Sequence, residues 1–500
     1  MAETATLQHG AAEAQKHELS VLLKAGHGLV VVETRDEQRV VALLTHVARE
    51  LGRPLFFWSA ARGLQWVGRD SAINGSQREP KELLRHIAQR RDQGIFILAD
   101  FGPFLDDPVV ARLLRELVEA PGPGHAGIVL VGSEFRLPDG LRGGAMRFEL
   151  KPPTAAEIET MVRELAREWR GDRQVQVDER ALKALVAHLA GLPMSDARRL
   201  ARNAIFDDGV LDEQDLPGIA EAKFRMLDSA GALQFELETE RFADVAGLER
   251  LKRWVDLRAE AFRSASPPAG LDPPRGVLLM GVQGCGKSLA ARAIAGRLQV
   301  PLLALDVGAL YNRYHGESER NLREALATAE HMAPCVIWID EIEKGLATGD
   351  SDGGTSRRML ATLLTWMAGH KARVFIAATA NDVTRLPPEL LRKGRFDEIF
   401  FVDLPDETLR AEILRIHLRR RDQKPELYDL QRLAAMSEGF SGAELEHAVV
   451  AALYHAHAEG GRLSNQHLEQ AIVETRPLSV LMAEQIHALR AWARERTVPA

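Results

Sequence analysis

The chain has 500 residues, which is too long for one ordinary hydrophobic core, so about two to four domains are expected. Charged residues make up 27% of the sequence and hydrophobic residues 46%, a balance that is typical of globular domains and not of a disordered chain. The formal net charge of −7 excludes a general attraction to nucleic acid or to an anionic membrane.

Targeting segments and cross-links are not predicted. The start of the chain lacks a basic stretch followed by an apolar core, so no secretory signal is expected. No uninterrupted apolar run reaches the roughly 18 residues of a membrane span. Cys285 and Cys335 are too few for a disulfide framework or a structural zinc site. We therefore expect a cytoplasmic protein.

The first half of the chain predicts an α/β domain followed by helices. Residues 1–16 are rich in Ala and Glu and predict a flexible tail or a loose helix. Short apolar runs alternate with helical patterns over residues 17–152, which indicates a parallel sheet covered by helices. Residues 153–228 predict a helical domain, and residues 229–241 a linker.

One acid in this half first suggests a catalytic site. The stretch ILADFGPF (97–104) ends an apolar run in Asp100, as strands do when they present a carboxylate to a metal. Asp-Phe-Gly also imitates the metal-binding motif of kinases. The chain has no H-R-D and no glycine-rich loop upstream, so a kinase is excluded.

The second half repeats the same plan. Residues 242–403 predict a second α/β domain, residues 404–475 a helical lid and residues 476–500 a C-terminal helix. The tripeptide RLP at 136–138 recurs at 385–387, an offset of 249 residues (385 − 136). We interpret the chain as a duplication; two unrelated α/β modules are the alternative.

A phosphate-binding loop stands at the start of the second α/β domain. GVQGCGKS (281–288) fits G-x-x-x-x-G-K-S between an apolar strand and a helical run. The glycines let backbone amides approach phosphate oxygens, and the helix N-terminus supplies a positive dipole. We expect Lys287 to reach the terminal phosphates of a nucleotide and Ser288 to ligate Mg²⁺.

Acids and an amide follow the next strands. CVIWIDEIEK (335–344) ends a buried strand in Asp340, which would hold the metal through water, and Glu341, which would polarise the attacking water. VFIAATAND (374–382) brings Asn381, whose amide can hydrogen-bond both that water and the terminal phosphate. These acids follow a phosphate loop, so we expect them to be catalytic.

Two arginines complete the candidate site. Arg392 and Arg395 lie three residues apart in LRKGRFDE (391–398). Arginines delivered by a neighbouring subunit stabilise transition-state charge, an effect on the order of 10³ to 10⁵ in rate for GTPases. The alternative is that both are ordinary surface arginines.

In this order the motifs resemble AAA ATPases that carry the second region of homology. The resemblance covers residues 242–475 and includes DVAGLE (244–249) and GFSGAELE (439–446). Within that group, EIEKG and ATANDVTRLPPELLRKGRFDEIFFVDLP resemble the plastid and cyanobacterial family called hypothetical chloroplast frame forty-six, which has bacterial members. A degenerate N-terminal module before the AAA domain also fits that family.

The resemblance implies hydrolysis of ATP to ADP and phosphate, with Mg²⁺. It implies that Asp340 and Glu341 form the Walker B pair, that Asn381 is the first sensor, and that the two arginines act as fingers. The implied nucleotide contacts are Gly247, Gly281, Gly284, Cys285, Gly286, Lys287, Ser288, Leu289, Gly442 and Ala443. The implied metal ligands are Ser288 and Asp340. The thiol of Cys285 at a helix N-terminus could have a lowered pKa, which suggests a redox-sensitive site.

The resemblance also implies a ring, expected to be a hexamer, because arginine fingers act between neighbours. Tyr314, before GESE, matches the position at which an aromatic residue in AAA hexamers faces the pore and grips a polypeptide. The alternative is that Tyr314 packs beneath its loop. Residues 344–355, rich in Gly and Asp, would be a second pore loop.

Two classes of function remain open. One is a ring that threads or remodels a protein client, and the other is an ATP-dependent switch or scaffold without threading. Intact Glu341 and both arginines favour turnover. Proteolysis is disfavoured because H-E-x-x-H is absent, and a nucleic-acid motor because no basic run carries interleaved aromatics. RIHLRRR (415–421) is interpreted as a solvated helix face or a subunit contact.

The first half keeps the strand plan but not the nucleotide site. Where a phosphate loop would stand, ETRDEQR (33–39) has no glycine, no lysine and three acids, which would repel phosphate. Asp100 occupies the place of Asp340, and Phe101 stands where Glu341 would be. We expect a degenerate AAA-like module that binds an unidentified client or adaptor and helps to build the ring.

Overall fold

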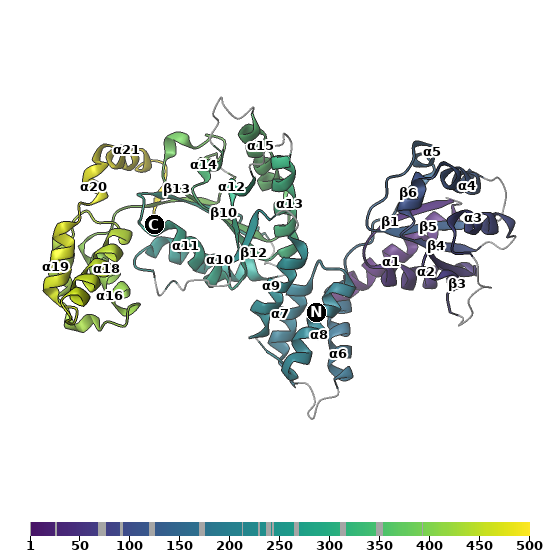
Figure 1. The fold of residues 1–500 in the computed structure, drawn as a ribbon, viewed down its shortest axis with the longest axis horizontal. Coiled ribbons are helices and arrows are strands. Elements are labelled where there is room, and N and C mark those ends of the chain that lie inside the picture. The colour runs from purple at the N-terminus through teal and green to yellow at the C-terminus, as the bar shows by residue number, and fades with distance from the viewer. Residues whose placement is uncertain are drawn as a thin grey trace. The chain divides into compact units, whose positions relative to one another are not determined.

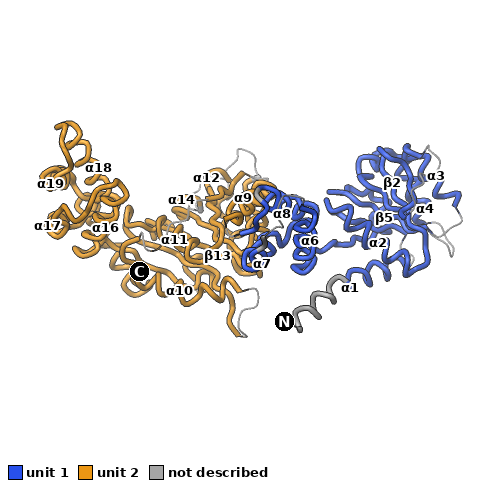
Figure 2. The backbone as a smooth tube through the Cα atoms, turned by 90° about the horizontal axis from the view of Figure 1, so that it is seen from below, with its two compact units in different colours: residues 1–213 blue, residues 214–500 orange. Residues whose placement is uncertain are grey.

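The computed structural model describes the chain apart from residues 1, 26–27, 69–76, 91–93, 120–125, 170–175, 213, 229–230, 237–241, 243–244, 265–269, 311–316, 347–353 and 393. Figure 2 shows its two compact units, residues 1–213 (unit 1) and residues 214–500 (unit 2). Tyr314 and most of the predicted second pore loop lie outside the described residues.

Unit 1 combines an α/β domain with a helical domain (Figure 1). The strands of the α/β domain are β1 (Leu29–Glu33), β2 (Leu55–Ser59), β3 (Gly63–Trp66), β4 (Ile95–Ala99), β5 (Gly127–Gly132) and β6 (Ala145–Arg147). Its helices are α1 (Ala2–Lys24), α2 (Glu37–Leu51), α3 (Pro80–Gln89), η1 (Gly102–Asp106), α4 (Pro108–Glu119) and α5 (Asp139–Arg142). The helical domain contains α6 (Ala155–Glu168), β7 (Gln176–Val177), α7 (Glu179–Leu189), α8 (Met194–Asp208) and β8 (Val210–Leu211).

The sheet of unit 1 has the order β3-β2-β4-β5-β1-β6, and only β3 runs antiparallel to its neighbour. Successive side chains of a strand point to opposite faces. On β4, Phe96 and Leu98 therefore pack with α3 and α4, whereas Ile95 and Ile97 pack with α1 and α2. This two-sided burial explains the continuous apolar runs of the sequence.

Unit 2 holds the second α/β domain and its lid. Its strands are β9 (Leu233–Glu236), β10 (Gly276–Gly281), β11 (Leu302–Leu305), β12 (Cys335–Ile339), β13 (Val374–Ala380), β14 (Glu398–Val402) and β15 (Val498–Pro499). The helices of the α/β domain are α9 (Asp215–Leu227), α10 (Glu249–Arg263), α11 (Lys287–Leu298), α12 (Val307–Leu310), α13 (Glu317–Met332), α14 (Ile342–Leu346), α15 (Thr355–Gly369) and η3 (Val383–Arg385). The lid and the C-terminal segment comprise α16 (Glu407–Arg419), η4 (Pro425–Leu427), α17 (Leu430–Met436), α18 (Gly442–Ala458), α19 (Asn465–Glu474), α20 (Leu478–Leu481) and α21 (Ala483–Ala493).

The two sheets share one topology. The sheet of unit 2 has the order β15-β14-β10-β13-β12-β11-β9, in which β11-β12-β13-β10-β14 repeats β2-β4-β5-β1-β6 of unit 1. An antiparallel strand covers the matching edge in both sheets, β3 in unit 1 and β9 in unit 2. The shared strand order supports the interpretation of a duplicated α/β plan.

The same division of faces holds in unit 2. On β10, Leu278 and Met280 pack in a cluster with α13 and α15, whereas Val277 and Leu279 pack with α10 and α11. The carboxyl ends of β10, β12 and β13 therefore meet at one edge of a rigid sheet. This is the edge at which parallel α/β sheets bind ligands.

The structure adds detail to the sequence expectations in three segments. Residues 2–16 belong to α1, whose Leu19 and Leu23 are buried in the core. The expected linker contains β9, which pairs with β11 because its apolar residues fit an open sheet edge. Helix α9, expected in the first helical domain, belongs to unit 2, where Phe224 joins the core cluster around α13.

The C-terminal segment is more than the predicted helix. After α21, β15 adds to the edge of the sheet beside β14. Arg490 of α21 forms an ion pair with Asp403, at 2.8 Å between Nη2 and Oδ1, just after β14. The end of the chain thus returns to the α/β domain beside the start of the lid.

Candidate nucleotide site

The phosphate loop lies between β10 and α11, as the sequence predicts. Gly281 has φ 149°, and a Cβ there would meet Val402 O at 1.9 Å. Gly284 has φ 78°, and a Cβ there would approach Ser441 Oγ to 2.9 Å. Both positions therefore require glycine, because a side chain would clash and, at Gly284, the backbone is left-handed.

Lys287 is buried at the first turn of α11, with 6% of its surface exposed. Its Nζ donates to Gly281 O at 2.9 Å and to Val282 O at 2.8 Å. Burial lowers the pKa of Lys287 to about 8, although Glu343, Asp340 and other nearby acids counter this shift. The ammonium is therefore positioned inside the loop by backbone carbonyls.

Asp340 joins the phosphate loop to β13. Ser288 Oγ donates to Asp340 Oδ1 at 2.9 Å, and Thr379 Oγ1 donates to the same oxygen at 2.6 Å. A hydroxyl and a carboxylate oxygen side by side fit Mg²⁺, which takes one or two carboxylates and completes its shell with water and phosphate oxygens.

Glu341 and Asn381 are in direct contact. Asn381 Nδ2 donates to Glu341 Oε1 at 2.7 Å, and Glu341 N donates to Thr379 Oγ1 at 2.9 Å. Glu343, which is only 2% exposed, accepts from Asn381 N at 2.8 Å and so fixes the backbone of that residue. The structure therefore brings together the acid and the amide that the sequence predicts, and it adds Thr379 and Glu343 as their supports.

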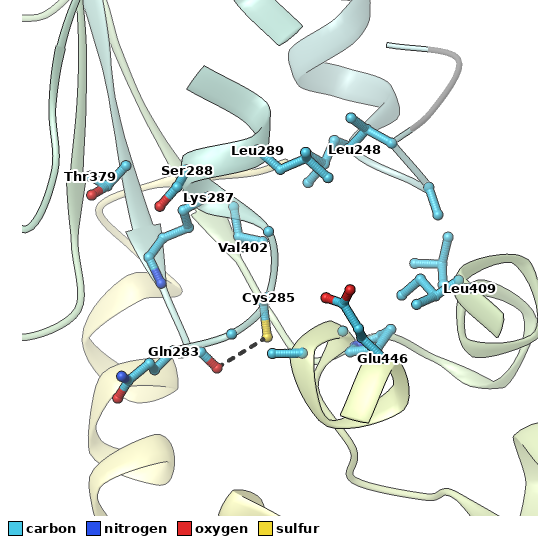
Figure 3. A pocket seen from close by; sticks show the side chains of 18 of the residues that line it. Leu248, Gln283, Cys285, Lys287, Ser288, Leu289, Thr379, Val402, Leu409 and Glu446 are labelled. Atoms are coloured by element: carbon cyan, nitrogen blue, oxygen red, sulfur yellow. Dashed lines mark hydrogen bonds between the residues drawn. The ribbon is translucent and has the colours of Figure 1, made fainter. Parts of the chain in front are cut away.

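These groups open into a cavity of about 520 Å³, within the usual range of about 300 to 1,000 Å³ for ligand pockets. Among the predicted residues, those that line it are Gly284, Cys285, Gly286, Lys287, Ser288, Leu289, Asp340, Glu341, Asn381, Gly442 and Ala443. In Figure 3, Lys287, Ser288 and Thr379 lie on one side, and Leu248 and Leu409 on the other. The cavity thus has a polar side suited to phosphates and an apolar side suited to a base.

Several residues that line the cavity were not predicted from the sequence. They are Val245, Ala246, Leu248, Gln283, Thr379, Val402, Asp403, Pro405, Leu409, Ile413, Ile416, His417, Arg420 and Glu446. Leu409, Ile413 and Ile416 recur at helical spacing on α16, which is the signal that could have found them. His417 and Arg420 belong to RIHLRRR, so this stretch is not only the solvated helix face or subunit contact that we expected.

Three polar side chains, those of His417, Arg421 and Glu446, lie beside the apolar side of the cavity. Arg421 Nη2 donates to Glu446 Oε1 at 2.7 Å, and this bond is the main reason for the lowered pKa of Glu446. His417 Nδ1 lies 3.7 Å from the same oxygen, and burial lowers the pKa of His417. The imidazole is therefore favoured in its neutral form beside the cavity.

The lid touches the phosphate loop directly. Ala443 N, in the first turn of α18, donates to Gly284 O at 3.0 Å. Ser441 caps this helix, since its side chain accepts from Glu444 N and Glu444 in turn accepts from Ser441 N. The Gly442-Ala443 step therefore lies at the cavity because a well-capped helix begins there.

Four of the predicted residues do not line this cavity. Gly247 packs instead beneath Leu409, whose Cδ2 lies 3.0 Å from a Cβ built on the glycine, and Gly281 stands at the end of β10. Arg395 Nη1 donates to Leu364 O at 2.7 Å, and Arg392 is exposed. Neither arginine lines the nucleotide cavity of its own chain.

The expectation of a reactive Cys285 is wrong. Burial raises the pKa of its thiol to about 12, and the opposing effect of Lys287 is smaller. The thiolate, which is the nucleophile and the form that oxidants attack, is therefore scarce at neutral pH. Burial therefore has a larger effect on the pKa of this thiol than its position at a helix N-terminus.

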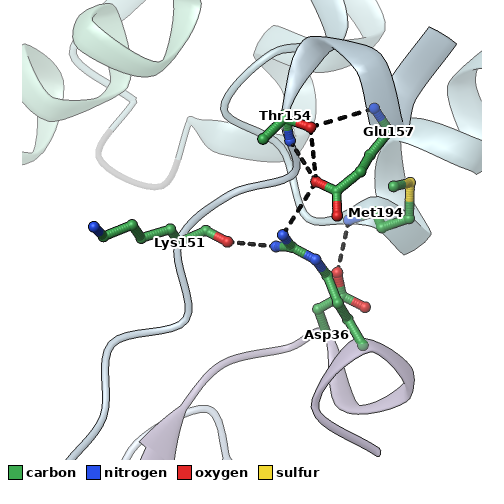
Figure 4. A network of polar contacts seen from close by, with 6 residues as sticks. Asp36, Lys151, Thr154, Glu157 and Met194 are labelled. Atoms are coloured by element: carbon green, nitrogen blue, oxygen red, sulfur yellow. Dashed lines mark hydrogen bonds and ion pairs between the residues drawn. The ribbon is translucent and has the colours of Figure 1, made fainter. Parts of the chain in front are cut away.

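In unit 1 the loop between β1 and α2 corresponds to the phosphate loop of unit 2, but it is built differently (Figure 4). Between β1 and α2 the loop has only residues 34–36, whereas residues 282–286 separate β10 from α11. Asp36, 4% exposed, accepts from Met194 N of α8 at 2.8 Å, and Arg39 Nη1 donates to Lys151 O. Side chains of the chain itself therefore join this loop to the helical domain.

Acids face this shortened loop. Burial and, next, the charge of Asp100 raise the pKa of Glu37, which begins α2 as Lys287 begins α11. Asp100 directly follows its strand, as Asp340 does, but its φ of 50° matches the 45° of Glu341. A phosphate would meet the carboxylates of Glu37 and Asp100 where unit 2 offers the ammonium of Lys287, which disfavours phosphate binding at this place.

Comparisons with known proteins give their own domain bounds, which place α9 with the first helical domain, as the sequence predicts. The ATPase family associated with various cellular activities (AAA) matches residues 277–404, and the AAA+ lid domain matches residues 428–470. The N-terminal domain of SpoVK-like AAA ATPases matches residues 15–150, and their second domain matches residues 156–230.

Similar proteins cover nearly the whole chain. The AAA domain-containing proteins ycf46 of Trieres chinensis and Pyropia yezoensis are each 33% identical over 482 residues, which is 95% of this chain and 96% and 97% of theirs. The proteasome-activating nucleotidase of Aeropyrum pernix is 38% identical over 233 residues, 44% of this chain and 56% of that protein. None of the described helices is long and apolar enough to cross a membrane.

Proposed function

We propose that this chain, which belongs to the AAA ATPase family that includes the ycf46 proteins and hydrolyses ATP, works as a ring that remodels a protein client. The observation that carries the proposal is the unbroken series of contacts from Ser288 through Asp340 and Thr379 to Glu341 and Asn381. A chain that only binds nucleotide has no need of a base held in place by its neighbours.

The residues divide the chemistry of hydrolysis among them. Lys287 would neutralise charge on the terminal phosphates of ATP, and Ser288 with Asp340 would hold Mg²⁺. The bound metal would supply positive charge to the phosphate oxygens. Glu341 would accept a proton from the attacking water, and Asn381 would orient that water through its amide.

A second copy of the chain would supply Arg392 and Arg395. Neither side chain lines the cavity of its own chain, and Arg392 is exposed. Proteins of the AAA family typically assemble as rings, so the arginines of one subunit would reach the cavity of the next. We expect a hexamer, in which each site is completed by a neighbour.

The client would be a protein. The relative from Aeropyrum pernix is named as a nucleotidase that activates the proteasome, which favours unfolding as the work that ATP drives. Tyr314 would grip the client in the pore, and unit 1 would bind the client or an adaptor. Unit 1 suits this role because its own side chains fix its helical domain to its sheet without a nucleotide.

The second candidate is an ATP-dependent switch or scaffold. It is favoured by the direct contact between Ala443 and Gly284, through which occupation of the cavity would reposition the lid. Such a switch would not need Tyr314 in a pore.

Sedimentation of the full chain tests the ring. Glu341→Gln, which should bind ATP without hydrolysing it, is compared with the wild type with and without ATP and Mg²⁺. We expect the variant to sediment as a ring with ATP. A monomer under all conditions contradicts the ring and the assignment of the two arginines as fingers.

A client assay then separates the two candidates. Tyr314→Ala should abolish ATP-driven unfolding of a tagged, folded test protein and keep the basal ATPase rate. Tyr314→Phe is the matched control and should retain unfolding. If Tyr314→Ala unfolds the test protein as well as the wild type does, threading is wrong and the switch is favoured.

A further inference from the structure

We propose that Lys344 is a positioning residue that restrains the carboxylate of Glu341 and keeps the basal rate of ATP hydrolysis low. The inference rests on the proposed role of Glu341 as the base. Lys344 lies three residues after Glu341, in the short helix α14, and its Nζ forms an ion pair with Glu341 Oε2.

Both oxygens of the proposed base are engaged by donors. Asn381 Nδ2 donates to Glu341 Oε1 at 2.7 Å, and the ammonium of Lys344 pairs with Oε2. A base must accept a proton from water through one of these oxygens. Each carboxylate oxygen can accept more than one hydrogen bond, so the ammonium of Lys344 does not block the base but competes with the attacking water at Oε2 and restrains the carboxylate.

The local backbone favours this pairing. Lys344 N donates to Glu341 O at 2.8 Å, which closes a turn between the end of the strand and α14 and keeps the two residues close. Glu341 has a φ of 45°, an uncommon conformation for a residue other than glycine, so the turn fixes the direction in which its side chain leaves the strand.

Lys344 approaches Glu341 from outside the nucleotide cavity. Glu341 lines both the nucleotide cavity and a second cavity of about 560 Å³. Lys344 lines the second cavity, together with Glu236, Arg292 and Asp306, and does not line the first. The ion pair therefore draws the carboxylate toward the second cavity and away from the water that would attack the nucleotide.

The pair is built to open. The side chain of Lys344 is 63% exposed and that of Glu341 is 27% exposed, so water competes for the ammonium. The lysine is thus an exposed restraint that can release, whereas Glu343 and Thr379 are buried supports.

Steady-state kinetics of the full chain test the proposal. Lys344→Met keeps the aliphatic stem and removes the charge. We expect its basal kcat for ATP to rise by up to about five-fold, with KM unchanged, because an exposed ion pair is a weak restraint. Lys344→Arg, which can still pair with Glu341, should keep the wild-type rate.

Two controls complete the experiment. Lys16→Met removes a lysine that pairs with Glu13 at the same spacing in unit 1, and it should leave kcat unchanged. Higher ionic strength, which screens exposed pairs, should raise the kcat of the wild type and Lys344→Arg but not that of Lys344→Met. A purely structural role of the lysine would not produce this selective salt effect.

The possible failures are distinguishable. If Lys344→Met has the kcat of the wild type or a lower one while Glu341→Gln is inactive, the restraint by Lys344 is wrong and the base assignment stands. If Glu341→Gln hydrolyses ATP at the wild-type rate, the base assignment is wrong, and the restraint fails with it. Should Lys344→Met fail to fold, a wild-type kcat that does not rise with ionic strength overturns the proposal.

Discussion

Thr379 is the support of the site whose loss should be most informative. Its hydroxyl is 1% exposed and connects two functional acids, because it donates to Asp340 Oδ1 at 2.6 Å and accepts from Glu341 N at 2.9 Å. Thr379→Val keeps the shape of the side chain and removes both hydrogen bonds. Nothing else in the core needs to move.

The expected magnitude follows from these two bonds. A hydrogen bond to a charged group contributes about 1.5 to 3 kcal/mol and a neutral one about 1 kcal/mol, so the variant should lose roughly 2 to 4 kcal/mol of unfolding free energy. For a domain of this size that lowers the midpoint of thermal unfolding by roughly 5 to 15 °C. Glu341 would also lose its fixed position, and a displacement of about 1 Å can reduce kcat on the order of a hundredfold.

Thermal unfolding and steady-state ATPase assays measure both effects on one preparation. The transition of unit 2 is identified as the one whose midpoint ATP raises. Thr379→Ser retains the hydroxyl and should keep most of the activity. Thr365→Val is a matched control, because Thr365 is exposed and donates only to Ala361 O within α15. Wild-type kcat and stability in Thr379→Val would refute the role of the hydroxyl.

Three further predictions concern both units. Lys287→Ala should abolish ATP binding by the full chain in equilibrium dialysis, because the buried ammonium is lost; binding that survives would mean that unit 1 holds nucleotide. Asp36→Ala should lower the unfolding free energy of unit 1 by about 1 to 3 kcal/mol, because Met194 N loses its acceptor. Faster proteolysis between α5 and α6 would report this loss. Asp36→Asn should have a smaller effect on both measurements. Iodoacetamide at pH 8 should alkylate Cys285 roughly a thousandfold more slowly than a free thiol, because a pKa of about 12 leaves little thiolate; rapid labelling before unfolding would contradict this.

The motifs of the site were predictable because each reaches its function through local backbone geometry. The phosphate loop needs a strand, a glycine-rich turn and a helix in direct succession, and all three are consecutive around Lys287. Asp340 and Asn381 end strands whose carboxyl ends share one edge of the sheet, so a parallel sheet was enough to bring them together. The family and the α/β plan of both halves follow from such local patterns.

The supports of the site were not predictable in the same way. Thr379 and Glu343 lie within two residues of predicted positions, yet neither residue type signals that the side chain of Thr379 contacts Asp340 or that Glu343 accepts from Asn381 N. The lid residues Ile413 and His417 reach the cavity only because α16 packs beside the phosphate loop. The raised pKa of the Cys285 thiol likewise depends on its surroundings in the folded chain.

By itself the sequence determined where the nucleotide motifs stand, because the glycines, the lysine and the acids at fixed spacing occur in the second half of the chain and not at the matching place in the first. Only the tertiary structure decided which groups the corresponding loop contacts in each half of the chain. In unit 2 the loop opens into a cavity that the lid helps to line, and in unit 1 Asp36 joins the shortened loop to the helical domain. The physical reason is that these contacts join residues more than 100 positions apart, and their geometry is set by how helices pack on a sheet and not by neighbours in the chain.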